Sequence, residues 1–365
     1  MHSYTKMVNV ALFLVNRHDK RQSPFSRSTP MRHFVLDFFF LFWYFIKMTI
    51  PTYPHFSKID FSMKEEIEAY LPRLSDGCSE FFFSNIYFFR DYYHYQISKT
   101  AFGIIIVGKS EHTPFCMIPT GNIEESILVE LLERFGSLSF ISENLIQNNK
   151  HLFYQAAFSL EEDRNNFDYI YLREQLANLS GKKFHKKKNH VNKFEHTYKN
   201  ISVQALTEKN VSDALSILER WNTHVQSLEQ ATESKSEHND NNHNDSNIEE
   251  KTDYEAAKSC LEHIELFPVT GIILYVDQVP VAWTAGEISS DGKMAVVYFE
   301  KADITYIGAF QYINYAFANF LPETVQYINR EQDLGKPGLI HSKQTYHPIS
   351  FIKKYCLKQV KNGAV

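Results

Sequence analysis

The stretch TGIILYVDQVPVAWTAGEISSDGKMAVVYFE, residues 270–300, decides the fold of the C-terminal half of this chain. It contains three runs, TGIILYV, VPVAWTAGEI and MAVVYFE, which are rich in the β-branched and aromatic residues that favour strands. The dipeptide Asp277-Gln278 and the segment SSDGK separate them and are typical of turns. Strands joined by such short turns run antiparallel, so the stretch predicts a three-stranded meander.

The residues after the meander predict a crossover. Apolar side chains recur at helical spacing at Phe310, Ile313, Phe317 and Phe320. Pro322 ends this helix, and the run VQYIN, residues 325–329, predicts a further strand. A strand, a helix and a strand in succession form a right-handed crossover. A meander followed by this crossover resembles the element order of the GCN5-related acetyltransferases.

The first half shows the same order of elements. Strands are expected near residues 92–98, 102–107 and 114–118, followed by a helix at 123–135 and the strand SLSFIS, residues 137–142. We therefore predict an α/β (α+β) protein with two tandem acetyltransferase-like domains. Each domain is expected to hold a mixed, largely antiparallel sheet flanked by helices.

The predicted domains are residues 48–165 and 166–360, with a disordered insertion at 230–253. The insertion includes TESKSEHNDNNHNDSNIEEKTD, which has too few apolar residues to offset the entropy of ordering. His238 and His243 within it favour a solvated loop over a metal site, since the metal itself would have to order its ligands. No metal is expected.

Residues 1–47 are interpreted as a non-native or disordered extension, with Met48 as the native start. The apolar stretch 38–46 is too short to span a bilayer, which takes about 20 apolar residues, so no transmembrane segment is predicted. The alternative is an interfacial anchor rich in Phe and Trp.

The bulk composition excludes a general polyanion binder, because the formal net charge is -5. Any affinity for nucleic acid or anionic lipid must then come from a local basic patch. The four cysteines are far apart, with no Cys-x-x-Cys pair, which indicates neither a zinc site nor a disulfide framework. A reducing compartment is the expected environment.

The basic run LSGKKFHKKKNHVNKF, residues 179–194, is predicted to form a helix from Lys182 to Tyr198. Lys187 falls between Phe184 and Val191 on the apolar arc, where an ammonium needs a partner or an anionic ligand to offset its desolvation. The other lysines suit a solvated or RNA-facing surface. The candidate donor- or phosphate-binding residues in this run are Gly181, Lys186, Lys187, Lys188 and Asn189.

A second candidate segment is YINREQDLGKPGLIHSKQTYHP, residues 327–348, because it follows the last predicted core strand. Ligands bind at the carboxyl ends of strands in α/β folds. Arg330 can present a planar fork to a carboxylate or phosphate, and the acidic neighbours can act as a base or hold an amine. Structural ion pairing is the alternative. The candidates in this segment are Arg330, Glu331, Asp333, Lys343 and Tyr346.

A third segment, VVYFEKADITYIGAFQ, residues 296–311, supplies Glu300 at the end of a strand and Gly308 at the start of a helix. A small residue there lets a phosphate approach the backbone closely. The acetyltransferase phosphate loop normally has spaced glycines, however, and a single glycine gives coenzyme A binding little support.

Together these segments resemble one family. The motifs YLREQLANLSGKKFHKKKNHVNKF, FEKAD and NREQDLGKPGLIHSK occur in the same order in the phosphatidylglycerol lysyltransferase C-terminal domain family. The resemblance runs from about Asp168 to Tyr355 and implies two tandem acetyltransferase-like domains. It further implies a cytosolic module that takes an aminoacyl group from aminoacyl-tRNA and passes it to a lipid headgroup hydroxyl. The chain departs from the family pattern at Ile340 and Lys188, where arginine is usual, and nothing in it resembles the family's large membrane domain.

The resemblance implies an acyltransferase that moves an aminoacyl group from tRNA to a hydroxyl or amine acceptor, either a small molecule or a lipid headgroup. Lys186 and Lys187 would hold phosphate or RNA, Glu300 and Asp333 would orient the donor amine or act as base, and Arg330 with Lys343 would stabilise the attacked carbonyl. No resident cofactor is expected, since the acyl donor is a co-substrate. A cytoplasmic location follows, with peripheral membrane binding left open.

Two rival hypotheses remain. An acetyl-CoA-dependent N-acetyltransferase is disfavoured by the lone Gly308, and a non-catalytic RNA- or anion-binding module is mildly favoured by Ile340.

Overall fold

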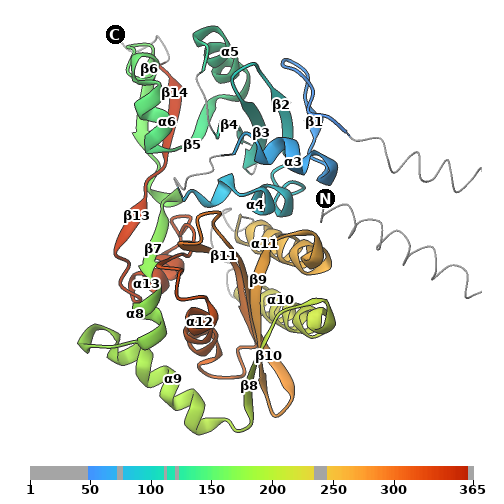
Figure 1. Ribbon diagram of the computed structural model, residues 1–365, viewed down its shortest axis with the longest axis vertical. Coiled ribbons are helices and arrows are strands. Elements are labelled where there is room, and N and C mark those ends of the chain that lie inside the picture. The colour runs from blue at the N-terminus through green and yellow to red at the C-terminus, as the bar shows by residue number, and fades with distance from the viewer. Residues whose placement is uncertain (1–47, 72–76, 111–112, 120–122, 234–244, 361–365) are drawn as a thin grey trace, which may run out of the picture. The chain divides into compact units, whose positions relative to one another are not determined.

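The computed structural model describes residues 48–71, 77–110, 113–119, 123–233 and 245–360, with the side chains of 228–252 left out (Figure 1). The expectation for residues 1–47 lies outside this part of the chain. Residues 48–365 form one compact unit. Its described residues form two seven-stranded mixed sheets flanked by helices, which confirms the predicted fold class.

The first sheet has the order β1-β2-β3-β4-β5-β14-β6. Its strands are β1 (Ser57–Lys58), β2 (Gln96–Lys99), β3 (Ile104–Ser110), β4 (Thr113–Met117), β5 (Ser137–Ile141), β14 (Tyr355–Gln359) and β6 (Phe158–Glu162). Only β4 and β5 pair in parallel, and the helix between them makes the crossover. The helices of this half are α3 (Lys64–Glu68), α4 (Phe83–Phe88), α5 (Glu125–Phe135), α6 (Glu143–Asn148) and α7 (Lys150–Phe153).

The second sheet has the order β13-β7-β12-β11-β10-β9-β8. Its strands are β13 (Ser350–Ile352), β7 (Asp168–Leu172), β12 (Tyr327–Asn329), β11 (Met294–Ala302), β10 (Val279–Ile288), β9 (Val269–Val276) and β8 (Ile201–Ala205). Its helices are α8 (Arg173–Asn178), α9 (His185–Thr197), α10 (Val211–Glu233), α11 (Asp245–Glu262), α12 (Ala309–Phe320) and α13 (Pro337–Gln344).

The predicted meander is formed by β9, β10 and β11, which pair antiparallel. Asp277 and Gln278 both have positive φ, 48° and 67°, as a two-residue turn between right-twisted strands requires. The second turn is closed by Ser289 and Asp291, whose side chains are hydrogen-bonded at 2.7 Å.

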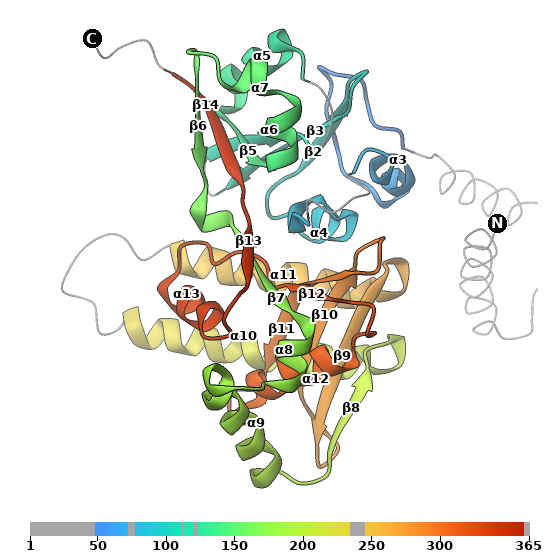
Figure 2. The same cartoon turned by 60° about the vertical axis from the view of Figure 1, so that its left-hand side comes forward.

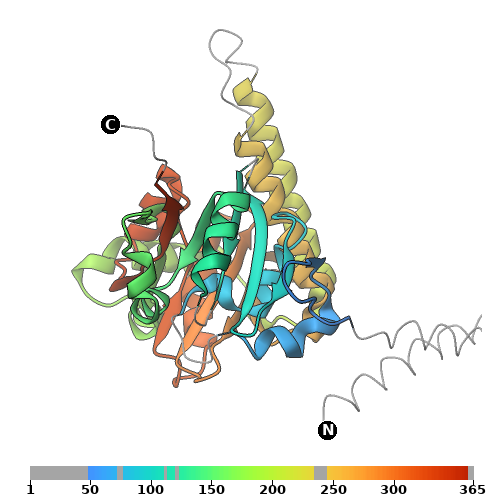
Figure 3. The ribbon, with the colours of Figure 1, turned by 90° about the horizontal axis from the view of Figure 1, so that it is seen from above.

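Alternate residues of the second sheet face two different cores. Ile272 and Leu274 pack with α8, α9 and α12 on one face. Ile273 and Trp283 pack on the other face with α10 and α11, and this core continues into the first sheet through side chains such as Ile106. The two halves of the compact unit therefore share one hydrophobic core. Figure 3 shows α10 and α11 side by side.

The C-terminal segment joins the two sheets. Strand β13 pairs with β7 in the second sheet, and the chain then crosses back so that β14 pairs with β5 and β6 in the first (Figure 2). The residues assigned from sequence to the C-terminal domain, 166–360, thus supply every described strand of the second sheet and also β14 of the first. Helices α10 and α11 also extend into the segment 230–253 that was expected to be disordered, and residues 234–244 within it lie outside the described residues.

Candidate functional site

The crossover strand β12 is shorter than its neighbour β11. It pairs with β11 in parallel over its whole length, ending at Val296 and Asn329, whereas β11 continues to Ala302. Glu300 lies on the part of β11 beyond this pairing, and Arg330 directly follows β12. These two charged side chains therefore meet beyond the carboxyl end of β12.

Glu300 binds two side chains at once. Arg330 Nη2 lies 3.2 Å from Glu300 Oε1, and the exposed fractions of the two side chains are 12% and 14%. Asn314 Nδ2, from α12, donates to Glu300 Oε2 at 3.2 Å. A carboxylate only accepts hydrogen bonds, so this contact fixes the amide orientation of Asn314 and turns its Oδ1 away from Glu300.

Two polar atoms beside this carboxylate lack partners. Within the described part of the chain, Arg330 Nη1 and Asn314 Oδ1 are both buried without a hydrogen bond. An unpaired buried polar atom costs about 1–3 kcal/mol, and native proteins contain few of them. Arg330 Nη1 can thus donate a hydrogen bond to a ligand, and Asn314 Oδ1 can accept one from it.

The ring of Tyr346 links the pair to α9. Arg330 Cζ lies 4.8 Å from the ring centroid and Lys187 Nζ lies 3.9 Å from it. Tyr346 is buried, and burial raises the pKa of its hydroxyl. The structure thus brings together Lys187, Arg330, Glu300 and Tyr346, four of the residues predicted from sequence.

The ammonium of Lys187 is in an unfavourable environment. Burial and, to a smaller extent, the charge of Arg330 lower its pKa to about 8, and Glu300 opposes this in part. Its neighbours Phe184 and Val191 are buried, as the helical arc predicted. An anion bound beside Lys187 and Arg330 would relieve both effects, because it would stabilise the protonated amine.

Lys343 contacts the backbone next to Arg330. Its Nζ donates to the carbonyl oxygens of Arg330 and Glu331, to the latter at 3.1 Å. Burial lowers the pKa of Lys343 to about 8, and the charge of Arg330 acts in the same direction. Lys343 therefore holds the peptide that carries Arg330.

Glu331 and Asp333 lie apart from Glu300. Glu331 Oε1 accepts from Asn85 Nδ2 at 3.0 Å, and burial raises the pKa of Glu331 well above its usual value. Asp333 is buried and accepts hydrogen bonds from Arg164 at 3.1 Å and from the Tyr169 hydroxyl at 2.6 Å. These contacts suit a structural role.

The remaining candidates lie on or near α9. The exposed ones are Gly181, Lys186, Lys188 and Asn189. Gly308, the N-cap of α12, has φ 94°, and a Cβ there would lie 3.4 Å from the carbonyl oxygen of His190. The start of α12 therefore packs closely against α9, a geometry that leaves its single glycine little room for a phosphate.

Sequence reasoning missed Asn314, which completes the environment of Glu300. The signal was present, since Asn314 follows Ile313 and precedes Phe317 on the buried face of α12. A polar residue on such a face needs a buried partner. Phe320, which the same pattern assigned to the apolar face, is 44% exposed.

Two features are absent from the described residues. No cluster of three or more His, Cys, Asp or Glu side chains that could hold a metal ion occurs there. No helix in the described ranges is long and apolar enough to cross a membrane.

The meander, the crossover and the charged pair beyond β12 fit an acyltransferase-like protein. The family described as "Phosphatidylglycerol lysyltransferase, C-terminal" matches residues 72–358, and the chain belongs to this family.

Two solved structures illustrate the similarity. The chain is 29% identical to a conserved protein of unknown function from Bacteroides thetaiotaomicron VPI-5482, over 84% of this chain and 99% of that one, with a TM-score of 0.70. It is 10% identical to the C-terminal domain of a putative lysylphosphatidylglycerol synthetase from Agrobacterium fabrum, over 82% and 93% of the two chains, with a TM-score of 0.53. The second likeness shows the fold alone. No curated protein matches the chain in sequence.

Proposed function

We propose that this protein transfers an aminoacyl group from aminoacyl-tRNA to a hydroxyl or amine acceptor. The observation that carries the proposal is the pair of unpartnered atoms beside Glu300, Arg330 Nη1 and Asn314 Oδ1. An aminoacyl ester offers both complements, a carbonyl oxygen that accepts and an ammonium group that donates. Family membership agrees with this choice of donor.

In the proposed reaction, Arg330 Nη1 donates to the ester carbonyl oxygen. When the acceptor attacks the carbonyl carbon, negative charge develops on that oxygen, and a positioned guanidinium stabilises it. Glu300 and Asn314 Oδ1 hold the α-ammonium group. The bond between the carbonyl carbon and the ribose oxygen then breaks. The proton that the acceptor loses passes to that ribose oxygen, so the tRNA leaves as its free hydroxyl.

The basic residues of α9 are proposed to bind the phosphates of the tRNA. Lys187 lies beside Arg330, and Lys186 is on the exposed surface of the same helix. Backbone phosphates favour lysine side chains, and such binding weakens steeply as salt rises. The donor acts as a co-substrate, and the proposal requires no resident cofactor. A cytoplasmic location and an acceptor in solution or in a lipid headgroup are compatible with it.

The first prediction concerns Arg330. We expect Arg330→Ala to lower the rate of transfer from charged tRNA by about 100-fold or more, because removing a single donor to a developing oxyanion costs about 10²–10³ in kcat. The measurement is the loss of labelled aminoacyl group from tRNA in the presence of candidate acceptors. Arg220→Ala is the matched control, since Arg220 is an ion-paired arginine on α10 that bonds Asp303. The control should retain its rate.

The same assay also tests the two rival functions. Labelled acetyl-CoA replaces charged tRNA in a parallel reaction, and consumption of acetyl-CoA alone would replace our proposal with an N-acetyltransferase. Binding of tRNA with steep salt dependence but without turnover would indicate a non-catalytic module. If the Arg330→Ala protein is as active as the unaltered one, Arg330 does not take part in the reaction.

A further inference from the structure

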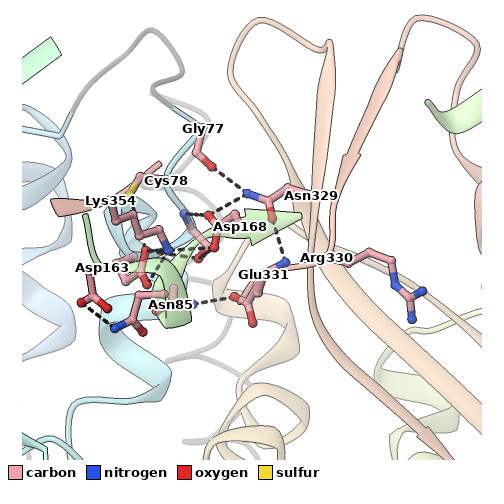
Figure 4. Close-up of polar contacts among 12 residues, drawn as sticks. Gly77, Cys78, Asn85, Asp163, Asp168, Asn329, Arg330, Glu331 and Lys354 are labelled. Carbon is pink, nitrogen blue, oxygen red and sulfur yellow. Dashed lines mark hydrogen bonds and ion pairs between the residues drawn. The ribbon is translucent and has the colours of Figure 1, made fainter. Parts of the chain in front are cut away.

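Three consecutive residues carry side chains in opposite directions. Figure 4 shows Asn329 and Glu331 directed into a polar cluster, whereas Arg330 extends away from it. Glu331 has a positive φ of 52°, which a residue with a Cβ rarely adopts. The direction of Arg330 is therefore set by how its two neighbours are held.

Both polar atoms of the Asn329 side-chain amide are hydrogen-bonded. Its Nδ2 donates to the carbonyl oxygen of Gly77 at 2.8 Å and to Asp168 Oδ2 at 3.0 Å. Its Oδ1 accepts from the backbone N–H of Glu331 at 2.7 Å. Asn329 is fully buried, so these bonds form without competition from water. The side chain thus ties the turn around Arg330 to the segment at Gly77, which precedes α4.

Asp168 is fixed by a buried charge cluster. The Ser79 backbone N–H donates to its Oδ2 at 2.9 Å, and Lys354 Nζ lies 2.7 Å from its Oδ1. Lys354 also contacts Glu80 at 2.7 Å and is 0% exposed. Burial alone would lower the pKa of Lys354, but the charges of Asp168 and Glu80 raise it, so the lysine stays protonated.

Glu331 is held by the N-terminal half as well. Asn85, on α4, donates to its carboxylate at 3.0 Å. Asn329 and Glu331, the residues on either side of Arg330, are thus each hydrogen-bonded to a residue before position 90. The elements β1 to β6 supply none of the four residues Lys187, Arg330, Glu300 and Tyr346, yet their half of the protein reaches the backbone that carries Arg330.

We propose that Asn85 and Asn329 are positioning residues, through which the N-terminal half sets the direction of the Arg330 side chain. The effect of this position on turnover rests on the proposed function. Misplacing a reacting group by about 1 Å can cost about 100-fold in rate, so a contact remote from the substrate can control turnover.

The test compares two neighbouring residues of α4. Asn85→Ala removes the contact with Glu331, whereas Ser84→Ala removes a different bond between the halves, from Ser84 Oγ to Glu287 at 2.5 Å. We expect Asn85→Ala to lower kcat by about 10-fold or more with little change in KM, because the donor still binds but is less well aligned. Ser84→Ala should stay within about two-fold of the unaltered protein. Equal effects of the two substitutions would overturn the proposal.

A double-substitution cycle separates positioning from a general loss of stability. If Asn85 acts through Arg330, then Asn85→Ala should lower kcat much less in an Arg330→Lys background than in the unaltered protein. Equal losses in the two backgrounds would mean that Asn85 acts by another route.

The positioning role can also be tested without enzymatic turnover, through the pKa of Lys187. The charge of Arg330 lowers the pKa of Lys187, which is about 8, so a displaced Arg330 should let that pKa rise. NMR titration of ¹³C-labelled lysine side chains, with Lys187 assigned by Lys187→Arg, would follow it. We expect a rise in Asn85→Ala and none in Ser84→Ala. An unchanged pKa in Asn85→Ala would overturn the positioning role, even if no donor were consumed and the proposed function had failed separately.

Discussion

Lys187 is proposed to bind the donor, but its buried charge lowers the stability of the folded protein. Its ammonium lies over the Tyr346 ring, and burial and Arg330 together hold its pKa at about 8. The ordinary value is 10.5, so between these two pH values the unfolded chain binds more protons than the folded one. The unfavourable contribution of Lys187 is therefore fully present below pH 8 and is relieved as the pH rises towards 10.5.

Removing the charge of Lys187 should raise the free energy of unfolding. Lys187→Met keeps the apolar stem and removes the charge, so at pH 7 we expect it to stabilise the protein by about 1 kcal/mol, an amount reduced for partial exposure. The gain should shrink as the pH rises from 8 to 10. Urea denaturation at several pH values measures this, with the exposed Lys186→Met as the control. Destabilisation at pH 7 would mean that Lys187 has a partner that offsets its burial.

Strand β14 shows what local sequence patterns leave out. The meander, the crossover helix and the α9 arc could be predicted because each depends on spacing within about 30 residues. The pairing of β14 with β5 and β6 could not, because it joins residues about 200 positions apart, and no local pattern states which sheet a short strand will enter. Glu300 and Arg330 could each be chosen as candidates because both residues sit at strand ends, but their contact with each other was not predicted. Asn314 was missed because an amide on a helix carries no chemical signature in sequence.

The position of β14 predicts the effect of a core substitution. Leu357 is 0% exposed and packs in the core between the first sheet and α5. Leu357→Ala should destabilise the protein by about 2–5 kcal/mol, because it removes buried methyl groups and leaves a cavity. Its neighbour Lys358 is exposed, so Lys358→Ala should change stability by less than about 0.5 kcal/mol. Chemical denaturation of both variants compares them, and a small loss for Leu357→Ala would show that β14 detaches without cost.

Three features join the two sheets of the compact unit. A single hydrophobic core contains residues of both, β14 returns to the first sheet, and Lys354 lies between Glu80 of the N-terminal half and Asp168 of β7. The two halves are thus not independent in energy. We expect the protein to unfold in one transition, because neither sheet can lose its structure without exposing the core of the other.

Lys354→Met tests this coupling. The substitution leaves Glu80 and Asp168 buried without their cation, and removing one partner from such a cluster costs about 3–5 kcal/mol. Burial raises the pKa of Glu80, and without the cation of Lys354 its protonated form is favoured further in the folded state. The deficit should therefore be smallest at about pH 4 and grow as the pH rises through the ordinary carboxyl range. When Trp43 and Trp221 are replaced by Phe, tryptophan fluorescence follows the second sheet through buried Trp283, and circular dichroism follows both sheets. We expect the two probes to give the same midpoint in urea for the unaltered protein and for the variant, with the variant's midpoint lower. Separate midpoints in the unaltered protein would contradict a single transition, and a pH-independent loss would contradict the role assigned to the buried carboxylates.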